Sequence, residues 1–144
     1  MQSGPRRRAV VLAGLALMAG KGFAADASSL PRPDPRWYEA AAAMRRLAMS
    51  WGDQPYGAVV VLQGELIGEG PSRVVKNGDI DAHAEREAIK DAQRRLGRSR
   101  LEGAVLYSTS RPCALCESAA ARAGIRRMYF GEALVDAGTP GVRE

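Results

Sequence analysis

Apolar residues recur at steps of three and four in the first patterned stretch of the chain, which predicts an amphipathic helix. The predicted apolar face consists of Trp37, Ala41, Met44, Ala48 and Trp51. Arg45 and Arg46 fall on the opposite face, and the helix is expected to end near Gly52. Ahead of it, residues 28–36 hold three prolines and no periodic pattern, which is typical of a linker.

A run of β-branched and apolar residues over 57–62 predicts a buried central strand. Gln63-Gly64 is a tight-turn signal, and residues 65–70 return as a shorter strand, so the two strands are expected to form a hairpin. The polar stretch that follows, residues 71–81, is expected to be a loop.

A second helix is expected over residues 82–96, with Asp81 as its N-cap and Gly97 closing it. Small apolar side chains repeat along one side of this helix, which would let it lie close to a sheet. This stripe consists of Ala84, Ala88, Ala92 and Leu96.

The last third of the chain predicts a strand, a helix and another strand. The strands are expected over residues 104–108 and 126–130. The helix between them is expected to start with Pro112 and Cys113, because proline suits the first turn of a helix. Beyond the second strand the pattern weakens, and residues 138–141 are expected to be an open tail.

The order helix, hairpin, helix, strand, helix, strand predicts an α/β protein, a three-layer α-β-α sandwich with a mixed sheet. A chain of 144 residues is long enough to bury the core of one domain, expected over residues 37–144. Its hydrophobic content of 46% and charged content of 26% are typical of a soluble globular protein.

Residues 1–27 have the pattern of an export signal. Three arginines, residues 6–8, precede an uncharged apolar run, and small residues flank Asp26, so cleavage is expected after Ala27. The apolar run is shorter than the roughly 20 residues that a bilayer span needs. The paired arginines favour the twin-arginine route to the periplasm, with an ordinary secretory signal or an uncleaved anchor as alternatives.

The net charge of +5 does not by itself indicate a polyanionic partner. Of the 21 basic and 16 acidic side chains, four basic and one acidic lie within residues 1–27. The rest of the chain therefore holds 17 basic against 15 acidic groups, a net charge of +2. A cluster of arginines in and after the second helix is expected to be a solvated face, and it consists of Arg94, Arg95, Arg98 and Arg100.

Two short motifs carry candidate chemistry, His83-Ala84-Glu85 and Pro112-Cys113-Ala114-Leu115-Cys116. One imidazole and two thiolates suit Zn²⁺, and three protein ligands leave a fourth position open for water, as in catalytic sites. Glu85 is expected to move protons beside that position. Both motifs fall at expected helix starts, where the helix dipole favours thiolate. The residues predict a zinc hydrolase that removes an amine.

Together with residues 57–61 and Ser110-Arg111, these motifs resemble the cytidine deaminase-like superfamily, and within it guanine deaminases and bacterial tRNA adenosine deaminases. The resemblance covers residues 37–135. It implies the same sandwich, usually with a fifth strand and a closing helix, and it suggests a homodimer. It also implies zinc ligation and acid–base catalysis by His83, Cys113, Cys116 and Glu85.

The resemblance further implies three substrate contacts. In purine-acting relatives an asparagine after the second strand contacts the substrate, and the matching position here is Ser72. Tyr56 matches a position near the pocket that is often phenylalanine, and the backbone N–H of Ala84 matches a contact to the ring carbonyl. Arg111 stands where many relatives have glutamate, which inverts the local charge.

We therefore expect hydrolytic deamination of a free nucleobase or small nucleoside, guanine first, with cytosine, cytidine or adenosine as alternatives. The expected export and the low charge of the mature chain disfavour tRNA as a substrate. Neither a stable nucleic-acid partner nor a membrane anchor in the mature form is expected. A disulfide or redox pair at Cys113 and Cys116, and a non-catalytic zinc-binding module, remain as alternatives.

Overall fold

The computed structural model describes residues 32–143 of the chain. The predicted export signal, residues 1–27, lies outside the described residues. Among the helices of the described part, none combines the length and the apolar character that crossing a membrane requires.

Helix α1 (Pro35–Ser50) confirms the predicted apolar face from Trp37 to Ala48 and starts within the predicted linker, while Trp51 lies beyond its end. The Asp34 carboxylate accepts a hydrogen bond of 3.0 Å from the Arg36 amide, and proline occupies the first turn, where it has no N–H to satisfy. Ala41 and Ala48 are buried, and Trp37 and Met44 pack partly buried against the same core. The helix therefore begins two residues earlier than its apolar pattern does.

Five strands form one mixed sheet in the order β2-β1-β3-β4-β5. Their bounds are β1 (Gly57–Leu62), β2 (Glu65–Pro71), β3 (Val105–Ser108), β4 (Arg127–Phe130) and β5 (Val135–Gly138). Strands β3 and β4 are parallel, and the other three neighbouring pairs are antiparallel. The mixed sheet and the first four strands are confirmed, and the fifth strand agrees with the family resemblance.

The predicted hairpin joins β1 to β2 through a two-residue turn. Gln63 and Gly64 both have positive φ, 50° and 76°, which is the backbone of the turn type that matches the twist of antiparallel strands. The pairing of β1 with β2 has one irregularity, a register shift between Val60 and Val61.

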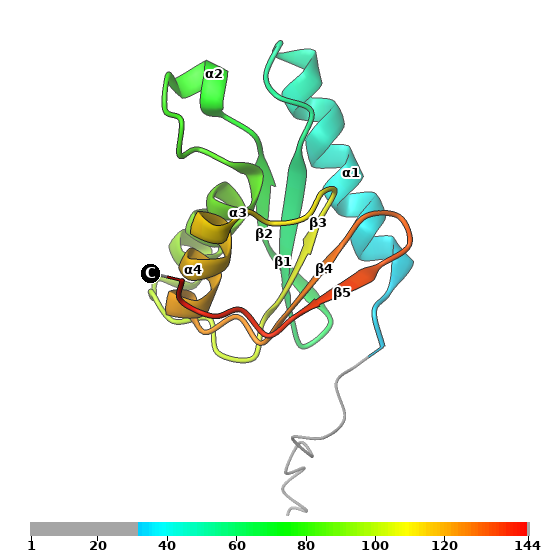
Figure 1. Cartoon of the computed structure of the whole chain (residues 1–144), viewed down its shortest axis with the longest axis vertical. Coiled ribbons are helices and arrows are strands. Elements are labelled where there is room, and N and C mark those ends of the chain that lie inside the picture. Colours follow the sequence, from blue (N-terminus) through cyan, green and yellow to red (C-terminus); the bar gives the residue numbers. More distant parts are fainter. Residues whose placement is uncertain (1–31, 144) are drawn as a thin grey trace, which may run out of the picture. The chain divides into compact units, whose positions relative to one another are not determined.

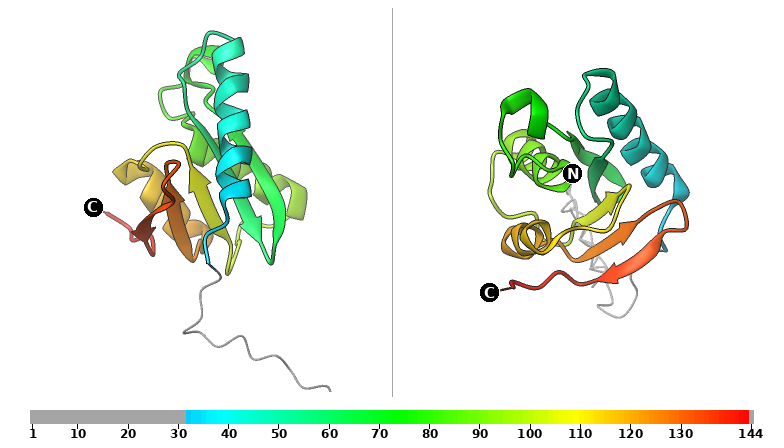
Figure 2. Two further views of the ribbon diagram at one scale, coloured as in Figure 1. Left: turned by 90° about the vertical axis from the view of Figure 1, so that its right-hand side faces the viewer. Right: turned by 45° about the horizontal axis from the view of Figure 1, so that its top comes forward.

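Helices cover both faces of the sheet (Figures 1 and 2). Helix α1 lies on one face, and α3 (Ala84–Leu96) and α4 (Ala114–Ala123) lie on the other. Strand β1 is buried on both sides, because Val59 and Val61 face the α1 side while Ala58 and Val60 face α3. The three-layer α-β-α sandwich is confirmed.

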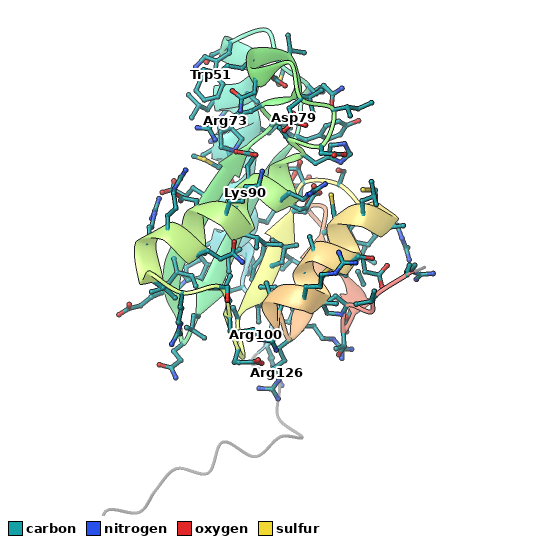
Figure 3. The ribbon with its side chains drawn as sticks, turned by 90° about the vertical axis from the view of Figure 1, so that its left-hand side faces the viewer. Trp51, Arg73, Asp79, Lys90, Arg100 and Arg126 are labelled. Atoms are coloured by element: carbon teal, nitrogen blue, oxygen red, sulfur yellow. The ribbon has the colours of Figure 1, made fainter. Side chains whose placement is uncertain are left out.

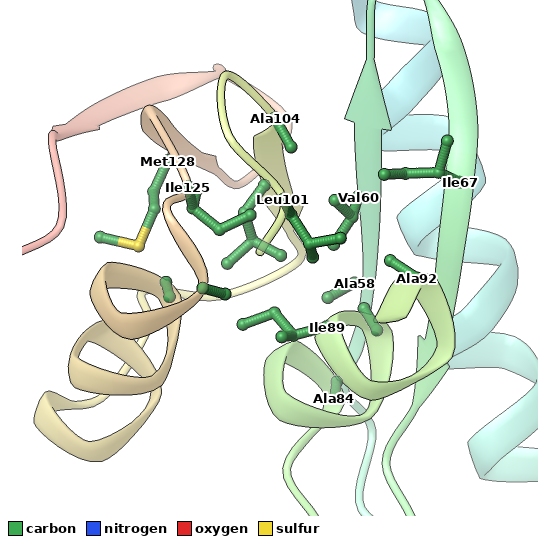
Figure 4. Close-up of a cluster of buried hydrophobic side chains, with 14 residues drawn as sticks. Ala58, Val60, Ile67, Ala84, Ile89, Ala92, Leu101, Ala104, Ile125 and Met128 are labelled. Carbon is green, nitrogen blue, oxygen red and sulfur yellow. The ribbon is translucent and has the colours of Figure 1, made fainter. Parts of the chain in front are cut away.

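The backbone of helix α3 packs directly against the backbone of β2, as the small residues of the helix predicted. Figure 4 shows α3 beside the sheet. A Cβ atom added to Gly70 would lie 2.1 Å from the Ala84 carbonyl oxygen, and one added to Gly68 would lie 2.3 Å from the Ala88 carbonyl oxygen. Two glycines of the strand therefore fix how closely the start of α3 approaches the sheet.

The predicted starts of α3 and α4 are each wrong by two residues. Asp81 is not the N-cap of α3, because it belongs to a turn that precedes the helix. In this turn the Asp81 amide donates to the Asp79 carboxylate over 2.9 Å. His83 is the N-cap residue, with extended φ and ψ of −65° and 151°. Cys113 is likewise the N-cap of α4 and not part of its first turn.

Two further segments differ from the sequence-based prediction. The loop expected over residues 71–81 contains a four-residue helix, α2 (Val74–Asn77), which is too short to leave a periodic pattern. The residues expected to form an open tail, 138–141, begin at the end of β5 and contact α4, since the Gly141 amide donates to Glu117 Oε1 over 3.3 Å. The Arg143 guanidinium that follows donates to Glu117 Oε2 over 2.9 Å. Among the described residues no helix follows α4.

Gly70→Ala should destabilise the protein by about 1–3 kcal/mol or more, because its methyl group would force α3 away from β2. Chemical denaturation followed by circular dichroism measures this change. Gly141→Ala is the matched control, since nothing lies within 4 Å of a Cβ at that position. Equal stability of the two variants would contradict the close approach.

Candidate metal centre and pocket

His83 stands immediately before the first turn of α3, and this position frees its side chain. It makes no capping hydrogen bond to the helix. Its Nδ1 atom instead lies 3.4 Å from Cys116 Sγ and 3.6 Å from Cys113 Sγ. A side chain one residue later would belong to the helix, so the extended backbone at His83 is what directs the imidazole to the two sulfurs.

Cys113 and Cys116 bring their sulfurs together at the start of α4. Cys113 is exposed and Cys116 is buried, and their Sγ atoms are 3.3 Å apart. The Cys116 amide donates to Cys113 Sγ over 3.4 Å, so the sulfur caps the helix in the way that serine or aspartate oxygens usually do. Both cysteines are free, so the disulfide alternative is not the state of this structure.

The donor set and its spacing fit zinc. All three ligand atoms of His83, Cys113 and Cys116 lie within 4.8 Å of one another. Tetrahedral ligands at about 2.0–2.3 Å from one zinc ion stand roughly 3.3–3.8 Å apart, close to the separations observed here. One nitrogen and two sulfur donors are a borderline-soft set, and three ligands are one fewer than closed structural sites use.

The metal has to displace a firmly held proton from Cys116. Burial raises the pKa of the Cys116 thiol, and the neighbouring Glu85 carboxylate raises this pKa further. Burial and the Glu85 carboxylate therefore oppose the effect that the helix start is expected to have on this sulfur. Zinc binding must release a proton, which makes the affinity dependent on pH.

Glu85 is a buried carboxylate beside this cluster, only 4% exposed. Ser108 Oγ, at the carboxyl end of β3, donates to Glu85 Oε1 over 2.6 Å. The other oxygen, Oε2, lies 3.5 Å from Cys116 Sγ. One oxygen is thus held by the sheet and the other faces the metal ligands. Ser108 was missed from the sequence, where its only signal is one polar residue at the end of an apolar strand.

A pocket of about 410 Å³ opens next to the cluster. Two of the three residues expected to contact substrate, Tyr56 and Ala84, line it, although their contact with a substrate stays a prediction. The complete lining is Gln54, Tyr56, His83, Ala84, Glu85, Ser110, Arg111 and Cys113. No described residue after Cys113 is part of it. Gln54 was not predicted, because nothing in its sequence surroundings marks it as functional.

Ser72 is not brought to this pocket, contrary to the expectation from the family resemblance. Its side chain is fully buried, and Ser72 Oγ donates to Asp53 Oδ1 over 2.9 Å. The amides of Gln54 and Lys76 donate to the same carboxylate, each over 2.8 Å. Burial by itself raises the pKa of Asp53, but these hydrogen bonds hold it below its ordinary value. Ser72 therefore helps to fix the loop that carries Gln54.

The loop with α2 is also fixed to the end of α1 through Trp51. The Lys76 ammonium lies 3.7 Å from the centroid of the Trp51 ring, and the Arg73 guanidinium lies 5.4 Å from it (Figure 3). Trp51, expected on the apolar face of α1, is 37% exposed and lies just beyond the helix. Cations rather than the core cover its ring.

We expect the protein to bind one zinc ion per chain. His83→Ala should weaken this binding by about 100-fold or more, since mutation of a residue that only supports a ligand already lowers metal affinity by about 10–100-fold. Metal content after dialysis, measured by mass spectrometry, and the spectrum of a cobalt-substituted sample report the site. Asn77→Ala changes an exposed residue outside the cluster and is the control. Zinc retained at full occupancy by His83→Ala would exclude this cluster as the metal site.

The chain is similar in sequence to curated relatives that include an adenosine deaminase and a guanine deaminase. A tRNA-specific adenosine deaminase of Agrobacterium fabrum is 46% identical over 77 residues, which cover 54% of this chain and 51% of the relative. A guanine deaminase of Bacillus subtilis is 36% identical over 87 residues, which cover 60% and 56%. The chain thus spans about half the length of these curated relatives.

Comparison with solved structures and with protein families leads to the same group of deaminases. A solved structure from work on A-to-I editing by tRNA deaminases at the wobble position of transfer RNA is 40% identical, covers 68% of this chain and 71% of that chain, and superposes with a TM-score of 0.66. The family model described as "Cytidine and deoxycytidylate deaminase zinc-binding region" matches residues 31–132. The chain therefore belongs to the zinc-dependent cytidine and deoxycytidylate deaminase family, with a zinc site formed by His83, Cys113 and Cys116.

Proposed function

We propose that the protein catalyses the zinc-dependent hydrolytic deamination of a nucleobase or nucleoside. The observation that carries this proposal is the meeting of three zinc ligands and one buried carboxylate at a single pocket of about 410 Å³. A binding module needs a metal site but has no use for a carboxylate held beside it at a cost in desolvation. The volume lies in the range of small-molecule sites, about 300–1,000 Å³.

Glu85 is the proton carrier in this proposal. Zinc held by the three ligands would acidify a water molecule and so supply the nucleophile. Glu85 Oε2, free of the hydrogen bond that engages Oε1, faces the ligands and is the atom that takes up a proton from the water. The same carboxyl group returns protons to a ring nitrogen and to the departing amine, so that water and the amino compound yield the carbonyl compound and ammonia.

A purine is the ring that we propose, with guanine as the first substrate to test. Its support is the similarity to a guanine deaminase and the position of Tyr56 in the pocket lining. Adenine in an adenosine-containing substrate is the second candidate, because the relative with 46% identity is a tRNA-specific adenosine deaminase. Cytosine and cytidine complete the test panel. The homodimer suggested by the resemblance stays a prediction.

The decisive experiment measures ammonia release from guanine, adenine and cytosine and their nucleosides by the zinc-loaded protein. We expect one ring type to react, and we expect Glu85→Gln to keep its zinc while kcat falls by about 10²–10⁴-fold, because the amide cannot carry the proton. Glu132→Gln removes an exposed carboxylate outside the pocket and is the control. Full turnover by zinc-loaded Glu85→Gln would refute the mechanism, and zinc binding with no turnover of any compound would favour a non-catalytic module.

Export to the periplasm is a further proposal, which rests on residues 1–27 alone. Transport of a folded, metal-loaded protein would keep the two zinc-bound thiolates from oxidation. In cell fractionation, changing Arg7 and Arg8 together to lysine should retain the protein in the cytoplasm, because the transport receptor reads the arginine pair. Lys21→Arg is the control. Cytoplasmic retention of the unaltered chain would contradict the proposal.

A further inference from the structure

Arg111 is the one arginine or lysine in the pocket lining. It lies on the segment that leads from the end of β3 to the start of α4, two residues before the zinc ligand Cys113. Its side chain is exposed, whereas Glu85 is buried at the metal end of the same pocket. The pocket thus has a carboxylate at its base and a guanidinium at its rim.

The side chain of Arg111 is held by an aromatic ring and not by an acid. Its guanidinium carbon lies 5.5 Å from the centroid of the Phe130 ring, at the end of β4. Within residues 32–143, no hydrogen bond or ion pair engages this guanidinium. A cation–π contact uses none of the N–H donors of the guanidinium in hydrogen bonds, so they stay available to a ligand.

Glu117, the acid whose pKa the charge of Arg111 affects, already has other hydrogen-bond partners. The Arg143 guanidinium donates to Glu117 Oε2 over 2.9 Å and the Gly141 amide donates to Oε1 over 3.3 Å. These two hydrogen bonds hold the pKa of Glu117 below its ordinary value, and the charge of Arg111 adds only a smaller effect. The positive charge of Arg111 is therefore not neutralised by this neighbour.

The zinc end of the pocket carries no net positive charge that would compete with Arg111 for an anion. Two thiolates and a neutral imidazole balance the two charges of zinc, and Glu85 is the only acid among the lining residues. A ligand that matches the pocket therefore has a neutral ring at the metal end and an anion at the rim. Arginine binds carboxylate and phosphate alike through two parallel N–H···O bonds, and of these two anions phosphate is the one that nucleosides carry in nucleotides.

We propose that Arg111 binds a phosphate group attached to the nucleoside, so that the pocket binds a phosphorylated form of its substrate more tightly than the free base or the unmodified nucleoside. This inference rests on the proposed function, because it places the ring at the zinc site. The phosphate belongs either to a mononucleotide or to a single-stranded oligonucleotide. In both, the same guanidinium contacts the phosphate oxygens at the rim, while the ring to be deaminated lies beside Glu85.

Equilibrium binding tests the proposal without depending on turnover. Isothermal titration calorimetry on the zinc-loaded full chain compares guanosine, adenosine and cytidine with their 5′-monophosphates and with short single strands that contain the same base. We expect at least one phosphorylated form to bind about tenfold or more tightly than its nucleoside, since hydrogen bonds between charged groups are among the strongest in proteins. Whether the monophosphate or the strand gains more identifies the source of the phosphate.

Variants assign the effect to Arg111. Arg111→Gln should bring the ratio of nucleoside to nucleotide Kd close to one, and Arg111→Lys should keep part of the preference as a point charge. Arg122→Gln removes an exposed arginine from the other end of α4 and should leave the ratio unchanged. Equal affinity for nucleosides and their phosphorylated forms, or a preference that survives in Arg111→Gln, would overturn the proposal. Absence of ammonia release from the bases, from the nucleosides and from their phosphorylated forms would refute the deaminase function, while the Kd ratio would still decide the role of Arg111.

Discussion

The contact between the backbone of α3 and the backbone of β2 sets the geometry on which the site depends. Side chains of ordinary size would hold a helix about 10 Å from a sheet, but Gly68 and Gly70 remove them from the strand. The helix in turn presents Ala84 and Ala88 at the contact. Because neither partner has a flexible side chain there, the position of the first turn of α3 cannot adjust without loss of packing. His83 and Glu85 lie at this turn, so their positions are as well defined as the core itself.

The other half of the site depends on the end of β3. This strand is central in the sheet, paired with β1 on one side and β4 on the other, and all four of its residues are buried. Ser108 ends β3 and donates a hydrogen bond to Glu85. Helix α4 begins at Ala114, six residues after Ser108, with Cys113 as its N-cap. Residues beyond the carboxyl end of a parallel strand commonly form binding sites in α/β proteins. A helix start from α3 and a helix start from α4 meet here because both helices pack on the same face of the sheet.

The sequence predicted the architecture and the metal ligands but not the details of the helix starts. The period of apolar residues follows from burial, so the strands and the close helix α3 were recognised from Val59, Val60, Ala84 and Ala88. Asp81 was a reasonable N-cap from its residue type alone, but a turn engages it, and residue type does not reveal which of two local hydrogen-bonding patterns prevails. Helix α2 and the contact between Ser108 and Glu85 depend on tertiary neighbours, for which no pattern along the chain exists.

The position of Ser72 separates the chemistry of the pocket from its specificity. The zinc ligands and Glu85 lie on helix starts that the core fixes, so the reaction type follows from elements that change little without loss of stability. The pocket wall is different, because Gln54 and Tyr56 lie on a loop whose shape depends on the Asp53 carboxylate. Ser72 donates to that carboxylate and is not among the residues that line the pocket, so its observed role is to support this loop. Among the residues that line the pocket, Arg111 is the one with a positively charged side chain, and this charge is the basis of the specificity that we propose.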